Sequence, residues 1–300
     1  MDNLKKAQEA NRYTMRKLHE VCHKYGIKYY YDSGALIGAV RHNSFVPWDD
    51  DIDVAFTREE YEKILAVPAE EWGDDFVLVT SKELTPGGFL DYTTRLVNVR
   101  DEVPVKTFDK CISKCLDKCK NRMCIDFFIL DNAYDSDFKQ KLLKTRLTFV
   151  YGMAMGHRDS IDLSEYSGIS KIVVAVLAAV GKLFSLGYLY RRYEKLSRSV
   201  KGSTGRYFYS NYPINLIGIT LKKEWFKEIV PVQVDDDYFD APACFDEVLK
   251  AQYGDYMQLP PKFERVPGHA QYFADFSRRM TLIQAKAEIR SGKHKKNMER

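Results

Sequence analysis

The stretch from Trp48 to Phe56 reads Trp-Asp-Asp-Asp-Ile-Asp-Val-Ala-Phe, which places four aspartates at the start of an apolar segment. One residue separates Asp51 from Asp53, so in an extended strand both carboxylates project from the same face, about 6–7 Å apart. The apolar Ile52 and Val54 project from the opposite face. Carboxylates at this spacing are typical of sites that hold Mg²⁺ (or Mn²⁺) against a polyphosphate. The segment therefore predicts an acidic strand with a divalent-metal site on one face.

A glycine-containing turn precedes this strand. Gly34 follows an aromatic run at residues 29–31, and the sequence from Ala35 to Val40 predicts a short helix. Glycine at a strand-to-helix turn lets backbone N–H groups approach a phosphate, and the helix N-terminus adds partial positive charge. Arg41 ends this helix as a cation. The turn and the acidic strand together predict a site for a phosphorylated ligand and its metal ion.

Three blocks of the sequence resemble the LicD family, which includes the fukutin-type transferases. The family pattern Gly-Thr-Leu-Leu-Gly-x-x-Arg, followed by Pro-Trp-Asp-Asp-Asp-Ile-Asp, is matched by Gly34 to Arg41 and by Pro47 to Asp53. The other two blocks, Ile125 to Asp131 and Tyr253 to Pro261, occur in the family's order. Because Ala35 replaces the threonine of the pattern, we expect the hydroxyl of a neighbouring serine, or backbone N–H groups, to contact phosphate instead. The resemblance implies that the nucleotide-binding residues are Ser33, Gly34, Gly38, Arg41, Trp48 and Asp49.

The resemblance also implies a nucleotidyltransferase fold, in which two carboxylates on one strand and a third on a neighbouring strand bind the metal. The third carboxylate here is Asp126, which joins Asp51 and Asp53 as a predicted metal ligand. Independently of the resemblance, Asp126 is the one charged residue in the apolar segment Cys124 to Leu130. A buried charge persists only when it is paired or metal-bound. The alternative to a metal at Asp126 is a salt bridge to a core arginine or lysine.

The composition fits an α+β fold of one large or two modest domains. The chain has 300 residues, 45% of them hydrophobic, and a net charge of +4, which gives no reason to expect nucleic-acid binding. We predict a nucleotidyltransferase-like mixed sheet with flanking helices as the catalytic core over residues 1–136. A helical and irregular acceptor-side region over residues 137–300 packs on this core. Because residues 1–10 are too polar for a secretory signal, we expect a cytoplasmic protein.

Local signals place several elements. Gly26 follows an apolar helical stripe and predicts a helix C-cap, and Thr57-Arg58-Glu59-Glu60 is a capping box that starts another helix. Alternating residues predict strands at 27–31, 76–80 and 92–99. The last of these carries Arg95, which we expect either to reach the phosphates of a substrate or to pair with acidic neighbours.

The apolar run from Ile172 to Gly181 is too short for a membrane span, which takes about 20 residues. Basic and aromatic residues follow it as far as Lys201. A helical face of this kind can rest on the anionic inner surface of the cell membrane, so peripheral membrane contact is one prediction. The alternative is a solvated face on a buried helix.

Four of the six cysteines fall within 14 residues. A cytoplasmic location argues against disulfides, and tetrahedral Zn²⁺ takes four thiolates, so the cluster predicts a structural zinc site. The alternative is that these cysteines are small buried hydrophobic residues. The residues concerned are Cys111, Cys115, Cys119 and Cys124.

The sequence His19-Glu20-Val21-Cys22-His23 matches the His-Glu-x-x-His pattern of zinc peptidases. Tyr29 stands where metzincins have a third histidine, and Cys22 belongs to the apolar stripe of the helix. Short patterns of this kind arise often by chance. We therefore expect an exposed or interfacial histidine pair at His19 and His23 without peptidase chemistry.

The resemblance implies a phosphotransferase that moves a phospho-alcohol, phosphocholine above all, from a CDP-linked donor such as CDP-choline, with CMP as the leaving group. The acceptor is a hydroxyl of a cell-surface glycan, such as a teichoic acid or capsule, or of its lipid-linked precursor. Asp49 or Asp50 is expected to orient a ligand or to act as the general base. Tyr253 and Asp255 are expected to shape the substrate pocket, and an aromatic group such as Trp48 or Tyr253 can hold a quaternary ammonium.

Two alternatives to this function stay open at the level of sequence. The same carboxylates suit nucleotidyl transfer from CTP or ATP, with pyrophosphate as the leaving group. The chain could also be a non-catalytic glycan-binding subunit at the membrane surface, although clustered charges have little use in an idle site.

Overall fold

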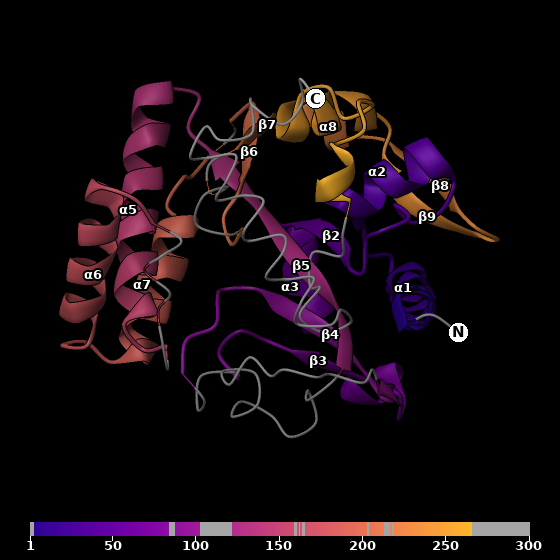
Figure 1. Cartoon of the computed structure of the whole chain (residues 1–300), viewed down its shortest axis with the longest axis horizontal. Helices are drawn as coiled ribbons and strands as arrows, with labels where there is room; N and C mark the ends of the chain where they lie inside the picture. Colours follow the sequence, from indigo (N-terminus) through magenta and orange to yellow (C-terminus); the bar gives the residue numbers. More distant parts are fainter. Residues whose placement is uncertain are drawn as a thin grey trace, which may run out of the picture.

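A computed structural model describes residues 3–83, 88–102, 122–158, 161, 163, 166–202, 204–212, 217 and 219–265. Within these residues one mixed sheet of seven strands forms the centre of the molecule (Figure 1). Five strands run in the order β1-β2-β5-β4-β3, and β6 and β7 continue the sheet from the second half of β5. Only β2 and β5 are parallel. The strands are β1 (Tyr30–Asp32), β2 (Ile52–Thr57), β3 (Phe76–Val79), β4 (Thr94–Glu102), β5 (Arg122–Ala133), β6 (Arg206–Tyr209) and β7 (Thr220–Lys222).

β5 is the longest of these strands and connects the two halves of the sheet. Its first half lies between β2 and β4, and its second half pairs with β6. The segment from Ile125 to Leu130 is apolar except for Asp126, and its apolar side chains are buried. A strand covered on both faces needs such a continuous apolar run. β5 therefore crosses the middle of the molecule, as Figure 1 shows.

Helices cover the sheet on several sides. Helix α1 (Asn3–Tyr25) packs beside β4 and β5, and its buried Met15 and Leu18 belong to the main core. α2 (Ser33–His42) and α3 (Arg58–Leu65) follow β1 and β2 directly. A two-stranded hairpin, β8 (Ile229–Val234) with β9 (Asp237–Pro242), packs against α2, and α8 (Phe245–Tyr253) follows it. Short 3-10 helices lie at Ala69–Trp72, Lys223–Phe226 and Lys262–Glu264.

A separate helical layer lies at one side of the molecule, at the left in Figure 1. It consists of α5 (Asp137–Met155), α6 (Ile169–Gly181) and α7 (Leu186–Ser197). α5 contacts both α6 and α7, and buried residues of α5 and α7 form a second core with β6. The predicted boundary at residue 136 falls between the end of β5 and the start of α5, and the division into two domains stays a prediction.

The predicted mixed α+β class is confirmed, and the local signals place most of the early elements. Thr57 accepts a hydrogen bond from the backbone N–H of Glu60, as the capping box predicts. Gly26 has the positive φ of a C-cap residue. The first strand begins at Tyr30 instead of residue 27, because the N–H of Ile27 still bonds to the carbonyl of Cys22 at 2.8 Å. β6 to β9 add strands to the C-terminal half that the sequence did not reveal.

Candidate active site

Three aspartates lie in one row across three neighbouring strands. Asp32 on β1 is in register with Asp53 on β2, and Asp53 is in register with Asp126 on β5. Residues paired in register across strands point to the same face of a sheet. The parallel pairing of β2 and β5 thus brings two predicted metal ligands together although 73 positions separate them in the sequence. Asp32, which the sequence analysis did not select, completes the row.

The electrostatics of Asp53 follow from this crowding. Burial raises the pKa of Asp53 well above its usual range, and the negative charges of Asp51, Asp126 and Asp32 raise it further. Burial and the charge of Asp51 act in the same way on the pKa of Asp49. Like charges this close disfavour ionisation of the whole group unless a cation offsets them. A bound cation would relieve this repulsion.

The loop before β2 adds the remaining carboxylates. One carboxylate oxygen each from Asp49, Asp50 and Asp51 lies within 4.8 Å of the others. Asp50 is fully buried, whereas Asp49 and Asp51 are partly exposed. Side chains of α1 hold this loop, because Gln8 donates to the carbonyl of Asp49 at 2.8 Å and Asn11 donates to that of Asp50 at 2.8 Å.

The turn between β1 and α2 lies against this acidic loop. A Cβ at Gly34 would come within 2.7 Å of the Asp49 carboxylate, so any larger residue would displace that aspartate. Ser33 has a φ of 56°, in the left-handed region that non-glycine residues rarely adopt. Strain of this kind persists where the surrounding structure enforces it, and it is common at functional sites. Gly34 therefore has a local reason to be glycine that involves the predicted site.

Gly38 has a different role in the structure. A Cβ there would lie 2.6 Å from the carbonyl oxygen of Ser44 and 2.8 Å from the nitrogen of Val46. The glycine lets the chain after α2 fold back closely onto the helix. It thereby fixes the start of the loop that carries the aspartates.

Asp126 forms an ion pair with Arg95 on β4. The Arg95 Nε lies 3.0 Å from Oδ1 of Asp126, and its Nη2 lies 2.7 Å from Asp91. Burial alone would lower the pKa of Arg95, but the charges of Asp126 and Asp91 raise it well above its usual range. The salt bridge anticipated as the alternative at Asp126 is therefore present. Arg95, predicted to reach phosphate, pairs with its acidic neighbours in this structure.

The third sequence block reaches the same turn. Tyr253 is the last residue of α8, and at the turn before α2 the hydroxyl oxygens of Ser33 and Tyr212 are 2.5 Å apart. Asp53 and Asp32 raise the pKa of Tyr253 in addition to its burial. The predicted substrate residue Tyr253 thus lies beside the carboxylate row. Asp255, two residues later, is exposed, and its carbonyl accepts a hydrogen bond from Gln258.

Residues from the C-terminal half also surround Asp32. The Tyr209 hydroxyl donates to Asp32 at 2.6 Å, and Gln252 donates to the other carboxylate oxygen at 2.9 Å. Burial nevertheless raises the pKa of Asp32. Both partners lie more than 170 residues from Asp32, so only the fold reveals this network. The one sequence signal was an aspartate at the end of the aromatic strand, directly before the glycine turn.

Arg41 and Trp48 lie at the edge of the site. Arg41 donates to the carbonyl of Tyr256 at 2.9 Å, which joins α2 to the third sequence block. The guanidinium of Arg265 lies over the Trp48 ring, 5.6 Å from its centroid. Both residues are partly buried. Their predicted contacts with a nucleotide stay predictions.

The predicted zinc site lies mostly outside the described residues, because Cys111, Cys115 and Cys119 are not among them. The fourth cysteine, Cys124, lies on β5 with its sulfur 3.7 Å from a carboxylate oxygen of Asp126. His19 and His23 form a pair with ring centroids 4.0 Å apart. His23 is exposed, in agreement with the expectation for the histidine pair.

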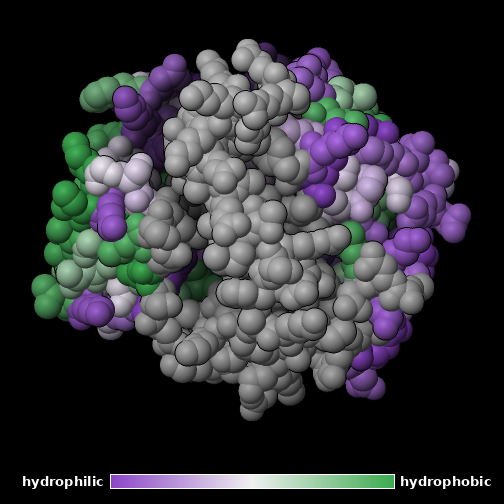
Figure 2. All heavy atoms as spheres, in the orientation of Figure 1, coloured by the Kyte–Doolittle hydropathy of each residue, from purple (hydrophilic) through white to green (hydrophobic). Residues whose placement is uncertain are grey.

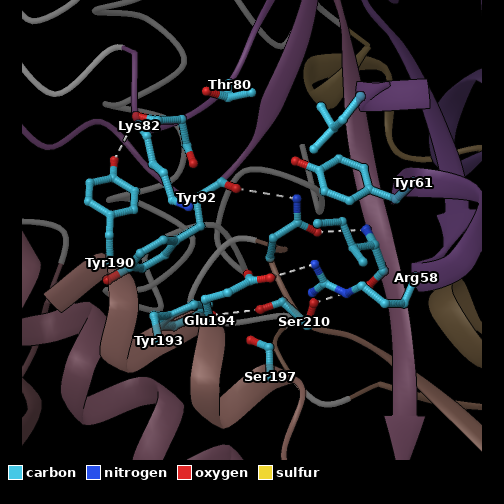
Figure 3. A pocket seen from close by; sticks show the side chains of 14 residues that line it. Arg58, Tyr61, Thr80, Lys82, Tyr92, Tyr190, Tyr193, Glu194, Ser197 and Ser210 are labelled. Atoms are coloured by element: carbon cyan, nitrogen blue, oxygen red, sulfur yellow. Dashed lines mark hydrogen bonds and ion pairs between the residues drawn. The ribbon is translucent and has the colours of Figure 1, made fainter. Parts of the chain in front are cut away.

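A cavity of about 120 Å³ lies on the other face of the sheet (Figure 3). Its lining includes Ile129, which is three positions from Asp126 on β5 and therefore points to the opposite face. Arg58 spans the cavity and pairs with Asp131 at 2.5 Å and with Glu194 of α7 at 2.9 Å. Tyr92 and Tyr193 stack beside it, 3.6 Å apart. These contacts fasten α7 to the sheet, and the cavity is distinct from the carboxylate row.

The residues fit a divalent cation of the Mg²⁺ type. Asp49, Asp51, Asp53 and Asp126 supply only hard oxygen donors, which Mg²⁺ and Mn²⁺ prefer. Burial and mutual repulsion raise the pKa of two of them, and a cation would relieve that repulsion. The ion pair with Arg95 leaves Asp126 with one positively charged partner already. A metal at this site therefore shares Asp126 with Arg95 or competes with it.

Comparisons with known proteins support the resemblance seen in the sequence. Residues 26–98 match the family described as LicD/FKTN/FKRP, nucleotidyltransferase domain. The chain is 27% identical over 267 residues to the lipopolysaccharide cholinephosphotransferase LicD of Haemophilus influenzae, which covers 84% of this chain and 91% of that protein. Shorter matches, 46% identical over 46 residues and 15% of this chain, occur in uncharacterized proteins of Rickettsia prowazekii and Rickettsia typhi, covering 17% and 15% of those proteins.

The family match begins at the helix C-cap, contains the glycine turn and the acidic strand, and ends on β4. The longer similarity to the Haemophilus protein extends over most of the chain. The resemblance predicted from the sequence motifs is therefore confirmed: residues 26–98 match the LicD/FKTN/FKRP nucleotidyltransferase domain, and most of the chain is similar to the Haemophilus protein.

Proposed function

We propose that this protein transfers phosphocholine from CDP-choline to a hydroxyl of a cell-surface glycan or its lipid-linked precursor, with CMP as the leaving group. The name of the Haemophilus relative supports the cholinephosphotransferase activity and points to a lipopolysaccharide acceptor. The observation that carries the proposal is the row of Asp32, Asp53 and Asp126 across β1, β2 and β5. A row of carboxylates beside a glycine turn suits a phosphorylated donor with a divalent cation.

In this proposal Asp51, Asp53 and Asp126 hold Mg²⁺ or Mn²⁺. When bound, the ion would offset the negative charge of the donor pyrophosphate and of the developing CMP. The aspartates position the ion, and the N-terminus of α2 presents backbone N–H groups after Ser33 and Gly34 toward phosphate oxygens. The requirement for the metal and the CDP-linked donor both belong to the proposal.

Asp49 is the general base that we propose. Asp49 is partly exposed and its pKa is raised, so it can accept a proton from an acceptor hydroxyl, whereas Asp50 is fully buried. Gly34 leaves room for the Asp49 carboxylate beside the phosphate-binding turn. A general base next to the donor phosphate is the arrangement that attack by a sugar hydroxyl requires.

Tyr253 is the residue that we expect at the choline head group. Tyr253 is 47% exposed, and the charges of Asp53 and Asp32 raise the pKa of its hydroxyl. An aromatic ring with nearby carboxylates attracts a quaternary ammonium. Trp48 is a weaker candidate because Arg265 already lies over its ring.

The test combines ligand binding with product analysis. Thermal unfolding is measured with CDP-choline, CDP-ribitol, CDP-glycerol, CTP and ATP, each with and without Mg²⁺, for the wild type and Asp53→Asn. A ligand at a hundredfold over its dissociation constant stabilises the folded protein by about 2.7 kcal/mol. We expect Mg²⁺-dependent stabilisation by CDP-choline in the wild type alone, and release of CMP when a glycan acceptor is added.

Other outcomes separate the alternatives. Stabilisation by CTP or ATP alone, with pyrophosphate as the product, would indicate nucleotidyl transfer. Stabilisation by a different CDP-alcohol would support the same type of transfer reaction with a different phospho-alcohol as the transferred group. No response to any nucleotide, together with binding of the glycan, would support a non-catalytic glycan-binding subunit.

A further inference from the structure

Helix α6 exposes a continuous stripe of large apolar side chains. Ile169, Ile172 and Val176 are 79%, 64% and 55% exposed, and Leu183 in the turn before α7 is 81% exposed. The spacing of three, four and seven residues places them along one face of the helical layer. Figure 2 shows this hydrophobic surface at the left edge of the molecule, over α5 and α6. An apolar surface of this extent on a folded protein marks an interaction site.

The way α6 packs explains why these side chains are not needed for the core. The helix buries only Val174, Ala178 and Gly181. A Cβ at Gly156 of α5 would collide with the carbonyl of Ala178, and a Cβ at Gly181 would collide with that of Met153. The two helices thus approach backbone to backbone through small residues, as helices do in membranes. The larger residues of α6 are left for an apolar partner outside the protein.

The charged side chains in the segment that carries this stripe are all positive. Residues 166–193 contain no aspartate or glutamate, and their charged residues are Lys171, Lys182, Arg191 and Arg192. All four are exposed. Apolar side chains combined with lysine and arginine are what an anionic lipid surface binds. A second copy of this chain would bring the same positive charges together, which disfavours self-association through this face.

Within the described residues, no single helix is long and apolar enough to cross a bilayer, and α6 and α7 reach that length and composition only as a pair bent by 117°. We propose that the outer face of α6 and the α6–α7 turn lies on an anionic lipid surface as a peripheral membrane contact. Ile172, Val176 and Leu183 enter the interface, and Lys171 and Lys182 contact lipid phosphates. This proposal concerns a surface and does not depend on the transfer reaction.

The experiment is co-sedimentation of the full chain with vesicles of phosphatidylcholine alone or with phosphatidylglycerol. We expect binding to the anionic vesicles that weakens as salt is raised. The double variant Ile172→Glu/Leu183→Glu should bind at least tenfold more weakly. Lys171→Gln and Lys182→Gln should each lower the affinity about fivefold at low salt, since a basic residue near the surface contributes about 1 kcal/mol.

Tyr238→Glu is the matched control, because Tyr238 is 57% exposed on β9 outside the helical layer. It should bind vesicles like the wild type. Circular dichroism and thermal unfolding must show that every variant folds. Equal binding by the wild type and the double variant would overturn the proposal. The proposal would also be overturned if the wild type does not bind vesicles and instead forms a dimer through this face, as detected by size-exclusion chromatography.

A second inference comes from a different cluster, on α1 and β9. One ligating atom each from His19, His23 and Asp240 lies within 4.8 Å of the others. His23 Nε2 is 2.9 Å from the Asp240 carboxylate, and His19 Nδ1 is 2.7 Å from the Tyr29 hydroxyl. The hydroxyl of Tyr29 also accepts the backbone N–H of Asp240 at 3.0 Å, so one tyrosine positions two of the three groups.

We infer that His19, His23 and Asp240 form a Zn²⁺-binding site separate from the carboxylate row. Two imidazoles and one carboxylate are a common donor set for Zn²⁺. A hydrogen bond on Nδ1 of His19 leaves Nε2 as its ligating atom, which is how outer partners usually orient metal-bound histidine. Glu20, the general base of the peptidase pattern, is instead exposed and pairs with Lys17. The proposed site therefore joins α1 to β9 and lacks the general base of the peptidase pattern.

Titration with Co²⁺ as a spectroscopic probe and competition by Zn²⁺ test this site. We expect Co²⁺ binding to produce d–d absorption. His23→Gln should lower the Co²⁺ affinity at least tenfold, and Glu20→Gln should leave that affinity unchanged. Because His23 is exposed, His23→Gln should fold normally, which circular dichroism verifies. Binding that His23→Gln does not change, or no Co²⁺ or Zn²⁺ binding by the wild type at micromolar concentration, would contradict the inference.

Discussion

The carboxylate row and the outer face of α6 break the usual rules of burial in opposite ways. In the first region Asp32, Asp53 and Asp126 place three carboxylates beside one another in the sheet. In the second, Ile169 and Leu183 leave apolar surface in water. Each arrangement lowers the stability of the isolated protein, so each is expected where a ligand restores what the chain lacks. We propose that a cation does so for the carboxylates and that lipid does so for α6.

The largest expected effect is that of Asp53→Asn. Removing this carboxylate should lower transfer about 10³-fold, or about 4 kcal/mol, because it is a proposed ligand of the ion that offsets the transition-state charge. The same change should raise the stability of the metal-free protein by about 0.5–2 kcal/mol, since it removes one of several repelling charges. Steady-state kinetics and thermal unfolding without metal measure the two effects. A variant that loses stability as well as activity would contradict this account of the row.

Arg95→Met tests the guanidinium that pairs with Asp126 at the end of the carboxylate row. It leaves Asp91 and Asp126 without their buried partner, and breaking such a pair costs about 3–5 kcal/mol. Urea unfolding should show this loss, and Mg²⁺ should recover part of it. Arg95→Lys, which keeps the charge, is the control and should lose less.

Gly156→Ala tests the close packing that holds α6 in place. A methyl group there meets the backbone of Ala178, so we expect a loss of about 1–3 kcal/mol. Gly187→Ala in α7 is the control, because its Cβ would meet only the end of the Arg191 side chain at 3.7 Å. That substitution should be neutral or stabilising by up to about 1 kcal/mol. Equal losses would mean that α5 and α6 do not pack as described.

The pH dependence of stability should follow the raised pKa values of Asp49 and Asp53. The folded state then holds protons that the unfolded state has already released, so these groups stabilise the fold at low pH. Their contribution is lost as pH rises from about 4 through their folded pKa values, by at most about 1.4 kcal/mol per pH unit for each proton. The lowered pKa of Asp91 acts in the opposite direction. Asp53→Asn should therefore reduce the decline, which urea unfolding between pH 4 and 8 measures.

The smallest effect is expected at the exposed stripe. Ile172→Ser should change the free energy of unfolding by less than about 0.5 kcal/mol, because the exposed Ile172 side chain makes few packing contacts that the substitution could remove. Val174→Ala, on the buried side of α6, should cost about 1–2 kcal/mol. Chemical unfolding of both variants without lipid gives the comparison. A large loss for Ile172→Ser would place that residue in the core and remove the basis for a lipid surface.

The sequence predicted the acidic strand and its neighbours well because their signals are local. The alternation from Ile52 to Phe56, the capping box at Thr57 and the glycine turn at Gly34 each depend on residues close in the chain. The single carboxylate in an apolar strand likewise identified Asp126, whose position opposite Asp53 is now seen in the register.

The remaining parts of the site depend on contacts between distant segments. Asp32 became a member of the row only through the antiparallel register of β1 and β2. The partner of Arg95 depends on the register of β4 and β5, and the contacts of Tyr209 with Asp32 depend on β6 joining the sheet. Neither periodicity nor capping signals carry information about such pairings. The packing of α6 through Gly156 and Gly181 could not be predicted from the sequence for the same reason.

The central place of β5 has a consequence for how the protein folds. Its partners β2, β4 and β6 come from both sides of it in the sequence, and the crossover between the parallel strands β2 and β5 contains β3 and β4. Pairings between distant segments form slowly, because the entropy of closing long loops is lost before the contacts form. We therefore expect Asp53 and Asp126 to meet late in folding, when most of the sheet exists. A partly folded chain would then lack the row, so binding of the proposed metal and donor would report on completed folding.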